Sequence, residues 1–280
     1  MIQDIFSHRF DNRYDGSAKP DESSKILYFQ GEDLLLVHKE IPLFKDLPVP
    51  SIYAFSIDKV SYFLALSSAP LPPGGEYVTV RKMRYEPSIS VDVTYASWIA
   101  LQLIRWMRNN KYCGRCGHEM IHKETERALF CPSCGYITYP RIDPAVIAAV
   151  TWKDSLLLAR YANRPIPYYV LVAGFAEIGE TLEDAVAREV KEETGLEVTN
   201  IRYYKSQHWP LSGSMVAGFF CDVKGDPVIT LDTRELKEAR WFKREDVILQ
   251  PDDYALTNEM MKIFKEHKNP CQSLEIKSCN

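Results

Sequence analysis

The sequence predicts an α+β protein with a β-rich amino-terminal domain, a small cysteine-rich module and a carboxy-terminal α/β domain with a mixed sheet. Short apolar segments fill residues 26–85, two Cys-x-x-Cys pairs follow a helical segment, and strand patterns then alternate with one clear helix. We expect domains at 1–108 (including a connecting helix), 109–139 and 140–270. A loose tail, 271–280, follows.

Composition sets the class of protein. The 280 residues are 46% hydrophobic, which is enough for sizeable cores, and the net charge of −4 gives no reason to expect strong adhesion to nucleic acid or anionic lipid. The amino-terminal segment has early acids and no apolar core of signal-peptide length, and no window elsewhere approaches the roughly 18 uncharged apolar residues of a membrane span. We therefore expect a cytoplasmic protein with no membrane partner.

The amino-terminal strands are followed by one long helix. The strand segments are 26–30, 33–39, 53–58, 60–67 and 77–85, with a Pro/Gly-rich loop before the last. Residues 93–109 then place apolar side chains at helical spacing. This helix either connects two domains or packs against a partner subunit, and a buried connector is the favoured interpretation.

The carboxy-terminal domain alternates strands with two helices. We expect strands at 145–152, 155–161, 168–174, 201–206, 215–223 and 238–242. A helix over 182–194 is predicted by Thr181 as N-cap, Asp184 three residues later and Gly195 just past the end. A last helix is expected over 255–268.

The cysteine module predicts a structural zinc site. Cys113, Cys116, Cys131 and Cys134 form two Cys-x-x-Cys knuckles, and four thiolates suit tetrahedral zinc with no open coordination position. A redox dithiol or two disulfides are the alternatives. His118 is expected at the surface.

The predicted helix over 182–194 carries an unusual concentration of acids. Glu189, Glu192 and Glu193 lie at i, i+3 and i+4, on one side of the helix and within reach of a common ion. Such oxygen donors suit Mg²⁺ or Mn²⁺. The alternative is an ordinary solvated helix face.

A longer pattern contains these acids. Gly-x5-Glu-x7-Arg-Glu-U-x-Glu-Glu-x-Gly-U, where U is bulky and aliphatic, is matched by Gly174, Glu180, Arg188, Glu189, Val190, Glu192, Glu193, Gly195 and Leu196. In this pattern the sequence resembles the Nudix hydrolases. The resemblance implies an α/β/α sandwich and a metal site for diphosphate hydrolysis. It assigns metal binding to Glu189, Glu193 and the carbonyl of Ala173, with Glu192 as helper. Arg188 is expected to orient Glu180 or another of these carboxylates.

The order of modules resembles the NADH pyrophosphatase branch of that family. That branch carries Ser-Gln-Pro-Trp-Pro-Phe-Pro-x-Ser, and this chain has "SQHWPLSGS" at residues 206–214. Ser206, Gln207, Trp209, Pro210 and Ser214 match, whereas His208, Leu211 and Ser212 depart. We expect the same loop with altered packing, in which His208 either touches substrate or is a surface residue.

Further site residues rest on the resemblance. It implies that Phe175 stacks on the nicotinamide ring, although core packing is an equal alternative. Tyr139 and Ile147 would line the same pocket, with Gln207, His208, Trp209, Pro210 and Ser214. Glu235 would be a further metal ligand and Glu238 a second candidate, although each alone would be taken for a surface residue. Thr257 aligns with a substrate contact of the branch.

The resemblance implies hydrolysis of NAD(H) to nicotinamide mononucleotide and AMP and permits removal of an NAD cap from RNA. It also implies a homodimer whose two subunits build the pocket. One alternative is a hydrolase of ADP-ribose or dinucleoside polyphosphates. Another is a non-catalytic nucleotide sensor with a zinc ribbon.

Overall fold

The chain folds into two compact units. The computed structural model describes residues 1–5, 8–163 and 166–267. The amino-terminal unit consists of Asp4–Arg141 with Pro210–Gly213, and the carboxy-terminal unit consists of Met1–Gln3, Ile142–Trp209 and Ser214–Asn280. Among the described residues, no helix is both long and apolar enough to cross a membrane.

Two small sheets form the β-rich part of the amino-terminal unit. One sheet has the order β1-β5-β6-β2 and the other the order β3-β4-β7. The strands are β1 (Phe10–Asp11), β2 (Lys25–Leu27), β3 (Phe29–Gln30), β4 (Asp33–Val37), β5 (Ser51–Ile57), β6 (Val60–Ala65) and β7 (Gly75–Thr79). Their apolar side chains share a core that includes Ile26, Leu35 and Phe63.

The strand expected over 77–85 is confirmed only up to residue 79, and the prediction is wrong for residues 80–85. β7 ends at Thr79, and a 3-10 helix, η1 (Val80–Tyr85), follows. Val80 and Met83 are its buried residues. Because a 3-10 helix has three residues per turn, this spacing buries both side chains on one face, which an alternating strand would not do.

The long helix of this unit is α1 (Val91–Asn109). Every residue from Val93 to Leu101 is buried, so the helix is enclosed on most of its circumference. The indole of Trp98 donates to the carbonyl of Val80 over 3.3 Å. The expectation of a buried helix is therefore confirmed. Beyond it, β8 (Ile121–His122), β9 (Leu129–Phe130) and β10 (Ile137–Thr138) form a three-stranded sheet of order β10-β9-β8.

The carboxy-terminal unit is built on one mixed sheet of order β14-β15-β11-β12-β16, with β13 paired to β11. Its strands are β11 (Asp143–Trp152), β12 (Ser155–Tyr161), β13 (Val172–Phe175), β14 (Val198–Trp209), β15 (Ser214–Val223) and β16 (Leu236–Lys243). A second 3-10 helix, η2 (Arg244–Asp246), follows β16. β11 and β15 run parallel, and the other pairs are antiparallel. All six expected strands are present; β12 has the expected limits and the other five have shifted ends.

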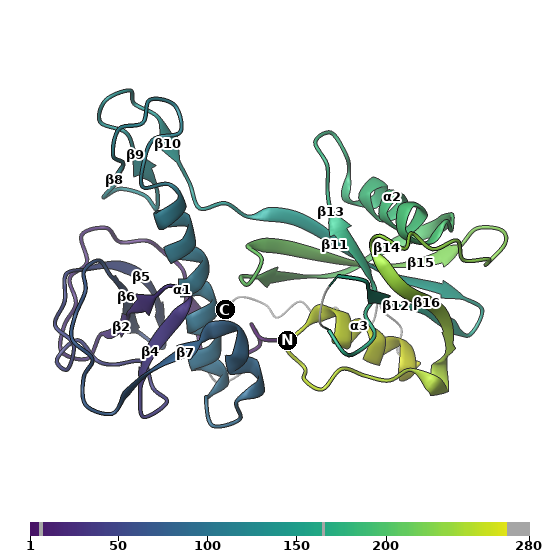
Figure 1. Ribbon diagram of the computed structural model, residues 1–280, viewed down its shortest axis with the longest axis horizontal. Coiled ribbons are helices and arrows are strands. Elements are labelled where there is room, and N and C mark those ends of the chain that lie inside the picture. The colour runs from purple at the N-terminus through teal and green to yellow at the C-terminus, as the bar shows by residue number, and fades with distance from the viewer. Residues whose placement is uncertain (6–7, 164–165, 268–280) are drawn as a thin grey trace. The chain divides into compact units, whose positions relative to one another are not determined.

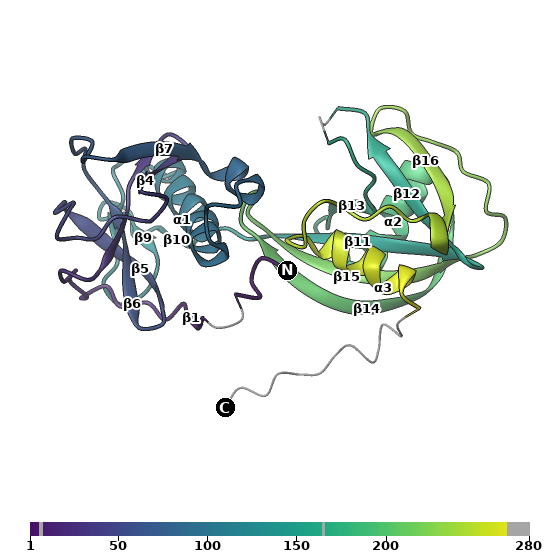
Figure 2. The same ribbon diagram turned by 90° about the horizontal axis from the view of Figure 1, so that it is seen from below.

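The two faces of this sheet carry different helices, α2 (Leu182–Thr194) and α3 (Leu256–Lys265), as Figures 1 and 2 show. Along β11, Val146, Ala148 and Val150 share a core with α2. Ile147 and Ala149 share the other core with α3. Alternate residues of a strand point to opposite faces, so one apolar strand serves both cores. The expected α/β/α sandwich with a mixed sheet is confirmed.

The predicted limits of α2 are confirmed. Thr181 and Asp184 form a reciprocal capping box, and Gly195 adopts the left-handed conformation with φ of 72° at the end of the helix. The expected last helix is shorter, because α3 spans only 256–265. Residue 268 and the expected tail lie outside the described residues.

A distant strand caps α3. Ala255 precedes the helix and has no side-chain cap. The Leu256 amide instead donates to the side-chain oxygen of Gln207, at 2.7 Å. The side-chain nitrogen of Gln207 donates to the side-chain oxygen of Gln3 at 2.9 Å and to the Tyr254 carbonyl at 2.8 Å. Gln207 therefore joins the chain start, β14 and α3.

Candidate active site and metal centre

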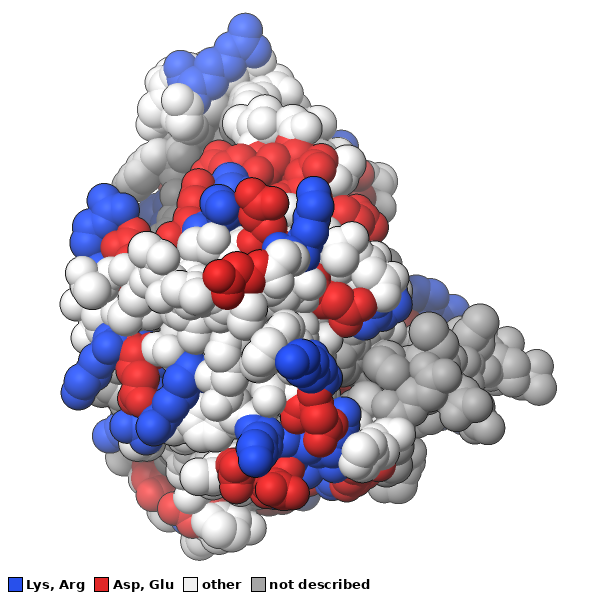
Figure 3. All heavy atoms as spheres, turned by 90° about the vertical axis from the view of Figure 1, so that its right-hand side faces the viewer, with Lys and Arg blue, Asp and Glu red and all other residues white. Residues whose placement is uncertain are grey.

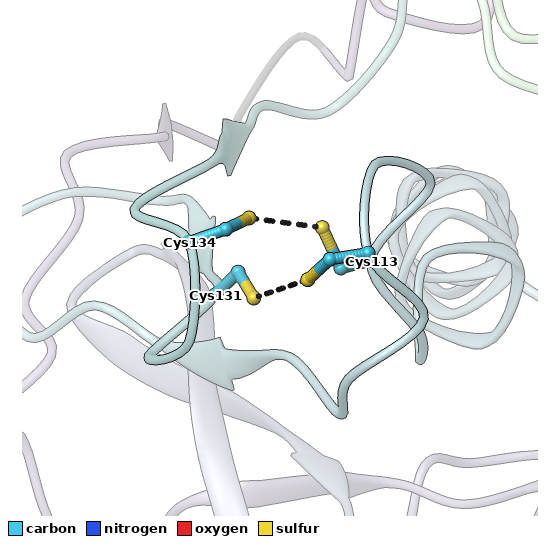
Figure 4. Close-up of side chains that lie close together, drawn as sticks. Cys113, Cys131 and Cys134 are labelled. Carbon is cyan, nitrogen blue, oxygen red and sulfur yellow. Dashed lines mark hydrogen bonds between the residues drawn. The ribbon is translucent and has the colours of Figure 1, made fainter.

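The four cysteines of the amino-terminal unit converge on one point. Cys113 and Cys134 have their sulfurs 3.7 Å apart, and those of Cys116 and Cys131 are 3.5 Å apart. Figure 4 shows Cys131 and Cys134 facing Cys113. All four sulfurs lie within 4.8 Å of one another. Sulfurs about 2.3 Å from a tetrahedral zinc ion would be roughly 3.8 Å apart, so this set fits zinc.

The backbone explains why the sulfurs converge. In each knuckle the glycine that directly follows the second cysteine has a positive φ, which is 77° at Gly117 and 74° at Gly135. The Gly117 amide donates to the Cys113 carbonyl, and the Gly135 amide donates to the Cys131 carbonyl. Both knuckles are therefore the same tight turn. His118 is exposed and contributes only its carbonyl to the first turn, as expected of a surface residue.

In the carboxy-terminal unit, Glu189 of α2 lies against the backbone of β13. A Cβ atom built on Gly174 would lie 2.0 Å from the carboxyl carbon of Glu189. Only glycine leaves room for this approach. Burial raises the pKa of Glu189, although hydrogen bonds from Arg188 oppose the shift. A partly desolvated carboxylate of this kind gains from a nearby cation.

Arg188 is the centre of the acidic site. Its guanidinium donates to both carboxylate oxygens of Glu180, at 2.5 and 2.9 Å. It also donates to Glu189 at 2.8 Å, to Glu192 at 3.0 Å and to the Phe175 carbonyl at 2.9 Å. The expected contact with Glu180 is confirmed. Arg188 lowers the pKa of Glu180 to about 2, with help from the Glu177 amide.

The three glutamates of α2 lie in different surroundings. Among the described residues, only the four cysteines form a set of three or more potential ligands within 4.8 Å of one another. Glu193 is 5% exposed, whereas the side chain of Glu192 is 60% exposed. Repulsion between carboxylates is relieved by the shared guanidinium of Arg188 instead. Hard oxygen donors around a desolvated carboxylate still suit Mg²⁺ or Mn²⁺.

The other acids lie near β16. Glu235 is exposed in the turn before β16, and its carbonyl accepts from the Ala162 amide. In the same turn, the Asp232 amide donates to the Glu193 carbonyl at 3.0 Å, which ties the turn to the end of α2. Glu238 on β16 accepts from the Tyr169 hydroxyl at 3.0 Å.

The expected pocket residues differ in exposure. Phe175, at the end of β13, is 50% exposed, so the alternative that it packs in the core is wrong. Ala173 pairs with Ile147, which is 8% exposed and lies in the core shared with α3. Tyr139, in the amino-terminal unit, is 54% exposed and donates to Glu126 at 3.2 Å. Thr257 is half-buried in the first turn of α3.

The segment 206–214 is a hairpin between β14 and β15, in which Trp209 pairs with Ser214. Gln207 and Ser214 are buried, and His208 is half-buried, with its pKa lowered by burial. Pro210 and Leu211 are buried at the tip. The Leu211 carbonyl accepts from Arg81 at 2.8 Å and from Arg105 at 2.9 Å, within the amino-terminal unit. Both polar atoms of the Gln207 side chain bond to the chain start and to the start of α3, which is a packing role that the sequence did not predict.

Sequence reasoning missed a basic cluster on the carboxy-terminal unit. The guanidinium groups of Arg160 and Arg240 both lie against the Tyr169 ring, and Glu238 accepts a hydrogen bond from the Tyr169 hydroxyl. The alternation in "SLLLARY" was a usable signal, because it places Arg160 on the same face as Leu156 and Leu158. The partners on other segments were not visible from the sequence.

Comparisons with known proteins match the two regions of the chain that contain these sites. The profile of the NUDIX domain matches residues 141–262, and that of the NADH pyrophosphatase zinc ribbon domain matches residues 108–139. A curated protein from Shigella flexneri, "NAD-capped RNA hydrolase NudC", is 44% identical over 162 residues, covering 58% of this chain and 63% of that protein. Its namesake from Escherichia coli O1:K1 / APEC is 43% identical over the same length.

A solved structure gives a similar match to part of the chain. The NUDIX hydrolase from Nitrosomonas europaea aligns with a TM-score of 0.49 and 25% identity, over 56% of this chain and 91% of that one. The chain spans less than two thirds of the length of the two curated relatives.

Proposed function

Residues 141–262 form a domain of the Nudix family, preceded by a zinc ribbon of the NADH pyrophosphatase kind, and from this premise we propose a metal-dependent diphosphatase. It would hydrolyse NAD(H) to nicotinamide mononucleotide and AMP. The observation that carries the proposal is the carboxylate of Glu189, partly desolvated against Gly174 and bridged by Arg188 to Glu180 and Glu192.

We assign metal binding and positioning to different residues of this site. Glu189, Glu193 and the Ala173 carbonyl would hold Mg²⁺ or Mn²⁺, with Glu192 assisting and Glu235 as a further ligand. A bound cation of this kind neutralises the diphosphate and lowers the pKa of a bound water. Arg188 acts as a positioning residue, because it fixes Glu180, Glu189 and the Phe175 carbonyl at once. The desolvation of Glu189 strengthens its attraction for a cation.

The substrate would be recognised by a flat aromatic surface. Phe175 follows Gly174 directly and is 50% exposed, which suits stacking on a heterocycle. Tyr139 exposes a comparable ring on the amino-terminal unit, and we assign it to the pocket of a homodimer. His208, Trp209, Pro210, Ser214, Ile147 and Glu238 complete the proposed surroundings of the substrate.

We extend the proposal to NAD-capped RNA, which the curated relatives are named for. Figure 3 displays acidic and basic side chains mixed over the face shown there, rather than one continuous basic stripe. Recognition would therefore depend on the cap more than on long-range attraction of the RNA chain. The zinc ribbon would be structural, and its four thiolates suit the reducing cytoplasm.

Product analysis tests the proposal. Full-length protein is incubated with NADH, NAD⁺ or NAD-capped RNA in Mg²⁺ and in Mn²⁺, and products are separated chromatographically. Glu193→Gln should abolish turnover while keeping the melting temperature, because it removes a charge at constant shape. Glu183→Gln, on the exposed first turn of the same helix, is the matched control and should stay active.

Two outcomes would replace the proposal. Preferential hydrolysis of ADP-ribose or diadenosine compounds would support the second candidate, which the departures at His208, Leu211 and Ser212 make worth testing. Nucleotide binding without any turnover would indicate a sensor. Size-exclusion chromatography with light scattering tests the homodimer, and a monomer with full activity would remove Tyr139 of a second subunit from the pocket.

A further inference from the structure

A basic cluster outside the acidic site surrounds Tyr169. The guanidinium carbon of Arg160 lies 4.4 Å from the centre of the Tyr169 ring, and that of Arg240 lies 5.3 Å from it. The Arg240 guanidinium also donates to the Tyr169 hydroxyl. Two cations held by one buried ring form a fixed pair of donors.

One carboxylate accompanies the two guanidinium groups. Glu238 accepts from the Tyr169 hydroxyl at 3.0 Å and forms an ion pair with Arg240 at 2.9 Å. It therefore balances only one of the two positive charges. Among the described residues, the buried Nε of Arg160 has no hydrogen-bond partner. An unsatisfied donor on a charged group is costly, and an anionic ligand would satisfy it.

The cluster lies on the α3 face of the sheet. Leu156 and Leu158 on β12 pack in the core shared with α3, so Arg160 continues that face. Arg240 shares the same face of β16, because its guanidinium lies 5.1 Å from the centre of the Phe242 ring. Figure 2 shows β12 and β16 side by side at one edge of the sheet. The acidic helix α2 packs on the opposite face.

A short turn connects this cluster to the acidic site. Beyond Arg160, the Ala162 amide and the Asn163 side chain donate to the carbonyls of Glu235 and Arg234, both at 2.9 Å. Asp232, in the same turn, donates to the Glu193 carbonyl of α2 at 3.0 Å. This turn therefore joins the segment that follows Arg160 to the end of α2.

We propose that Arg160 and Arg240 bind a phosphate group that the substrate carries outside the diphosphate to be cleaved. Guanidinium groups match phosphate oxygens with paired donors, and the two strands hold them on the face away from α2. In a substrate built on adenosine, such a phosphate is either a 2′-phosphate or the 3′-phosphodiester of an attached RNA. The identity of the substrate rests on the proposed function, whereas the existence of the anion site rests only on the arginine cluster.

Equilibrium binding tests the site without hydrolysis. Calorimetry on the full-length protein compares AMP with adenosine 2′,5′-bisphosphate and adenosine 3′,5′-bisphosphate. At least one bisphosphate should bind about tenfold more tightly than AMP, and Arg160→Gln or Arg240→Gln should remove that difference. Preference for the 2′ or the 3′ compound identifies the source of the phosphate. Equal affinity for all three ligands would overturn the proposal.

Matched variants separate binding from folding. Arg202→Gln removes a cation from β14, at the opposite edge of the sheet, and should leave the bisphosphate preference intact. Arg160→Lys and Arg240→Lys keep the charge and should keep part of the preference. If Arg202→Gln reduces the preference as much as the cluster variants do, the effect is one of net charge and the site is refuted.

Turnover separates this proposal from the proposed function. The two glutamine variants should lower kcat/KM about tenfold for the phosphate-bearing substrate, NADPH or NAD-capped RNA, and leave that for NADH unchanged. A protein that shows the arginine-dependent preference but hydrolyses none of these compounds would refute the proposed function alone. Hydrolysis of NADH with no arginine dependence in any assay would refute the anion site alone.

Discussion

The carboxylate of Glu189 occupies the space that any side chain at Gly174 would need, since a Cβ there would lie 2.0 Å from its carboxyl carbon. Gly174→Ala should therefore displace Glu189 from β13. Because a displacement of about 1 Å in an active site can lower rates about 100-fold, kcat/KM for NADH should fall by at least that factor. Steady-state kinetics and circular dichroism on the same samples give the measurement.

A matched glycine controls for that change. Gly114 has no heavy atom within 4 Å of a built Cβ, and its φ is not in the positive range. Gly114→Ala should leave activity and zinc content unchanged. Full activity of Gly174→Ala would show that Glu189 does not need its place on β13.

The pair of Glu180 and Arg188 predicts an acid-sensitive site. The pKa of Glu180 falls from 4.5 to about 2 in the folded protein, mainly through hydrogen bonds from Arg188. A lowered carboxyl pKa contributes stability above the unfolded value, and this is lost as the pH falls from about 4.5 towards 2. In thermal melts between pH 7 and 3, Glu180→Gln should therefore lose less stability than the wild type on acidification. Parallel curves for the two proteins would contradict the ion pair.

For Glu189 we expect a change of stability with pH that is opposite in sign to that of Glu180. Its pKa is raised by burial, so the ionised form destabilises the metal-free protein, and this penalty grows as the pH rises through the folded pKa. At neutral pH in a chelating buffer, Glu189→Gln should melt on the order of 1 to 2 °C higher than the wild type, since solvent screens part of the effect. Adding Mn²⁺ should stabilise the wild type alone. If Mn²⁺ raises the melting temperature of the variant as much as that of the wild type, Glu189 is not a metal ligand.

The cysteine cluster predicts a zinc-dependent fold of the amino-terminal unit. Cys113 and Cys131 are also buried members of a small core with Trp106, Met120 and Leu129. Cys131→Ser should lower the zinc content from about one ion per chain to background and shift the fluorescence of Trp106. Elemental analysis and emission spectra measure both. Cys221→Ala, in the core beneath α2, should keep its zinc, and retention of zinc by Cys131→Ser would contradict the site.

The sequence predicted those features that depend on near neighbours in the chain. The limits of α2 follow from Thr181, Asp184 and Gly195, which act within one turn of each helix end. Four thiolates in two turns likewise specify their own geometry. The membership of residues 141–262 in the Nudix family, expected from a local pattern, is confirmed.

Features that depend on distant partners were not predicted. Helical spacing placed three glutamates on one side of α2, but it could not show that Arg188 would gather Glu189 and Glu192 while Glu193 became buried. The strand expected over 77–85 ends early because η1 packs its buried residues in the amino-terminal unit. Tertiary packing overrides local propensity in such segments.

Gln207 has packing contacts in the structure, whereas the sequence predicted a contact with substrate. Its side chain bonds to Gln3, Tyr254 and Leu256 from a position that is 2% exposed. Gln207→Leu leaves the first amide of α3 without its acceptor and removes one of the two donors to the Tyr254 carbonyl, which keeps the Ile2 amide, so the free energy of unfolding should fall by about 1 to 3 kcal/mol. Urea titration measures this loss, and KM for NADH at 20 °C should stay within about twofold of the wild type. Ser206→Ala, exposed beside it, should change neither quantity. A large rise in KM with unchanged stability would return Gln207 to the substrate pocket, because a packing residue acts on the fold before it acts on binding.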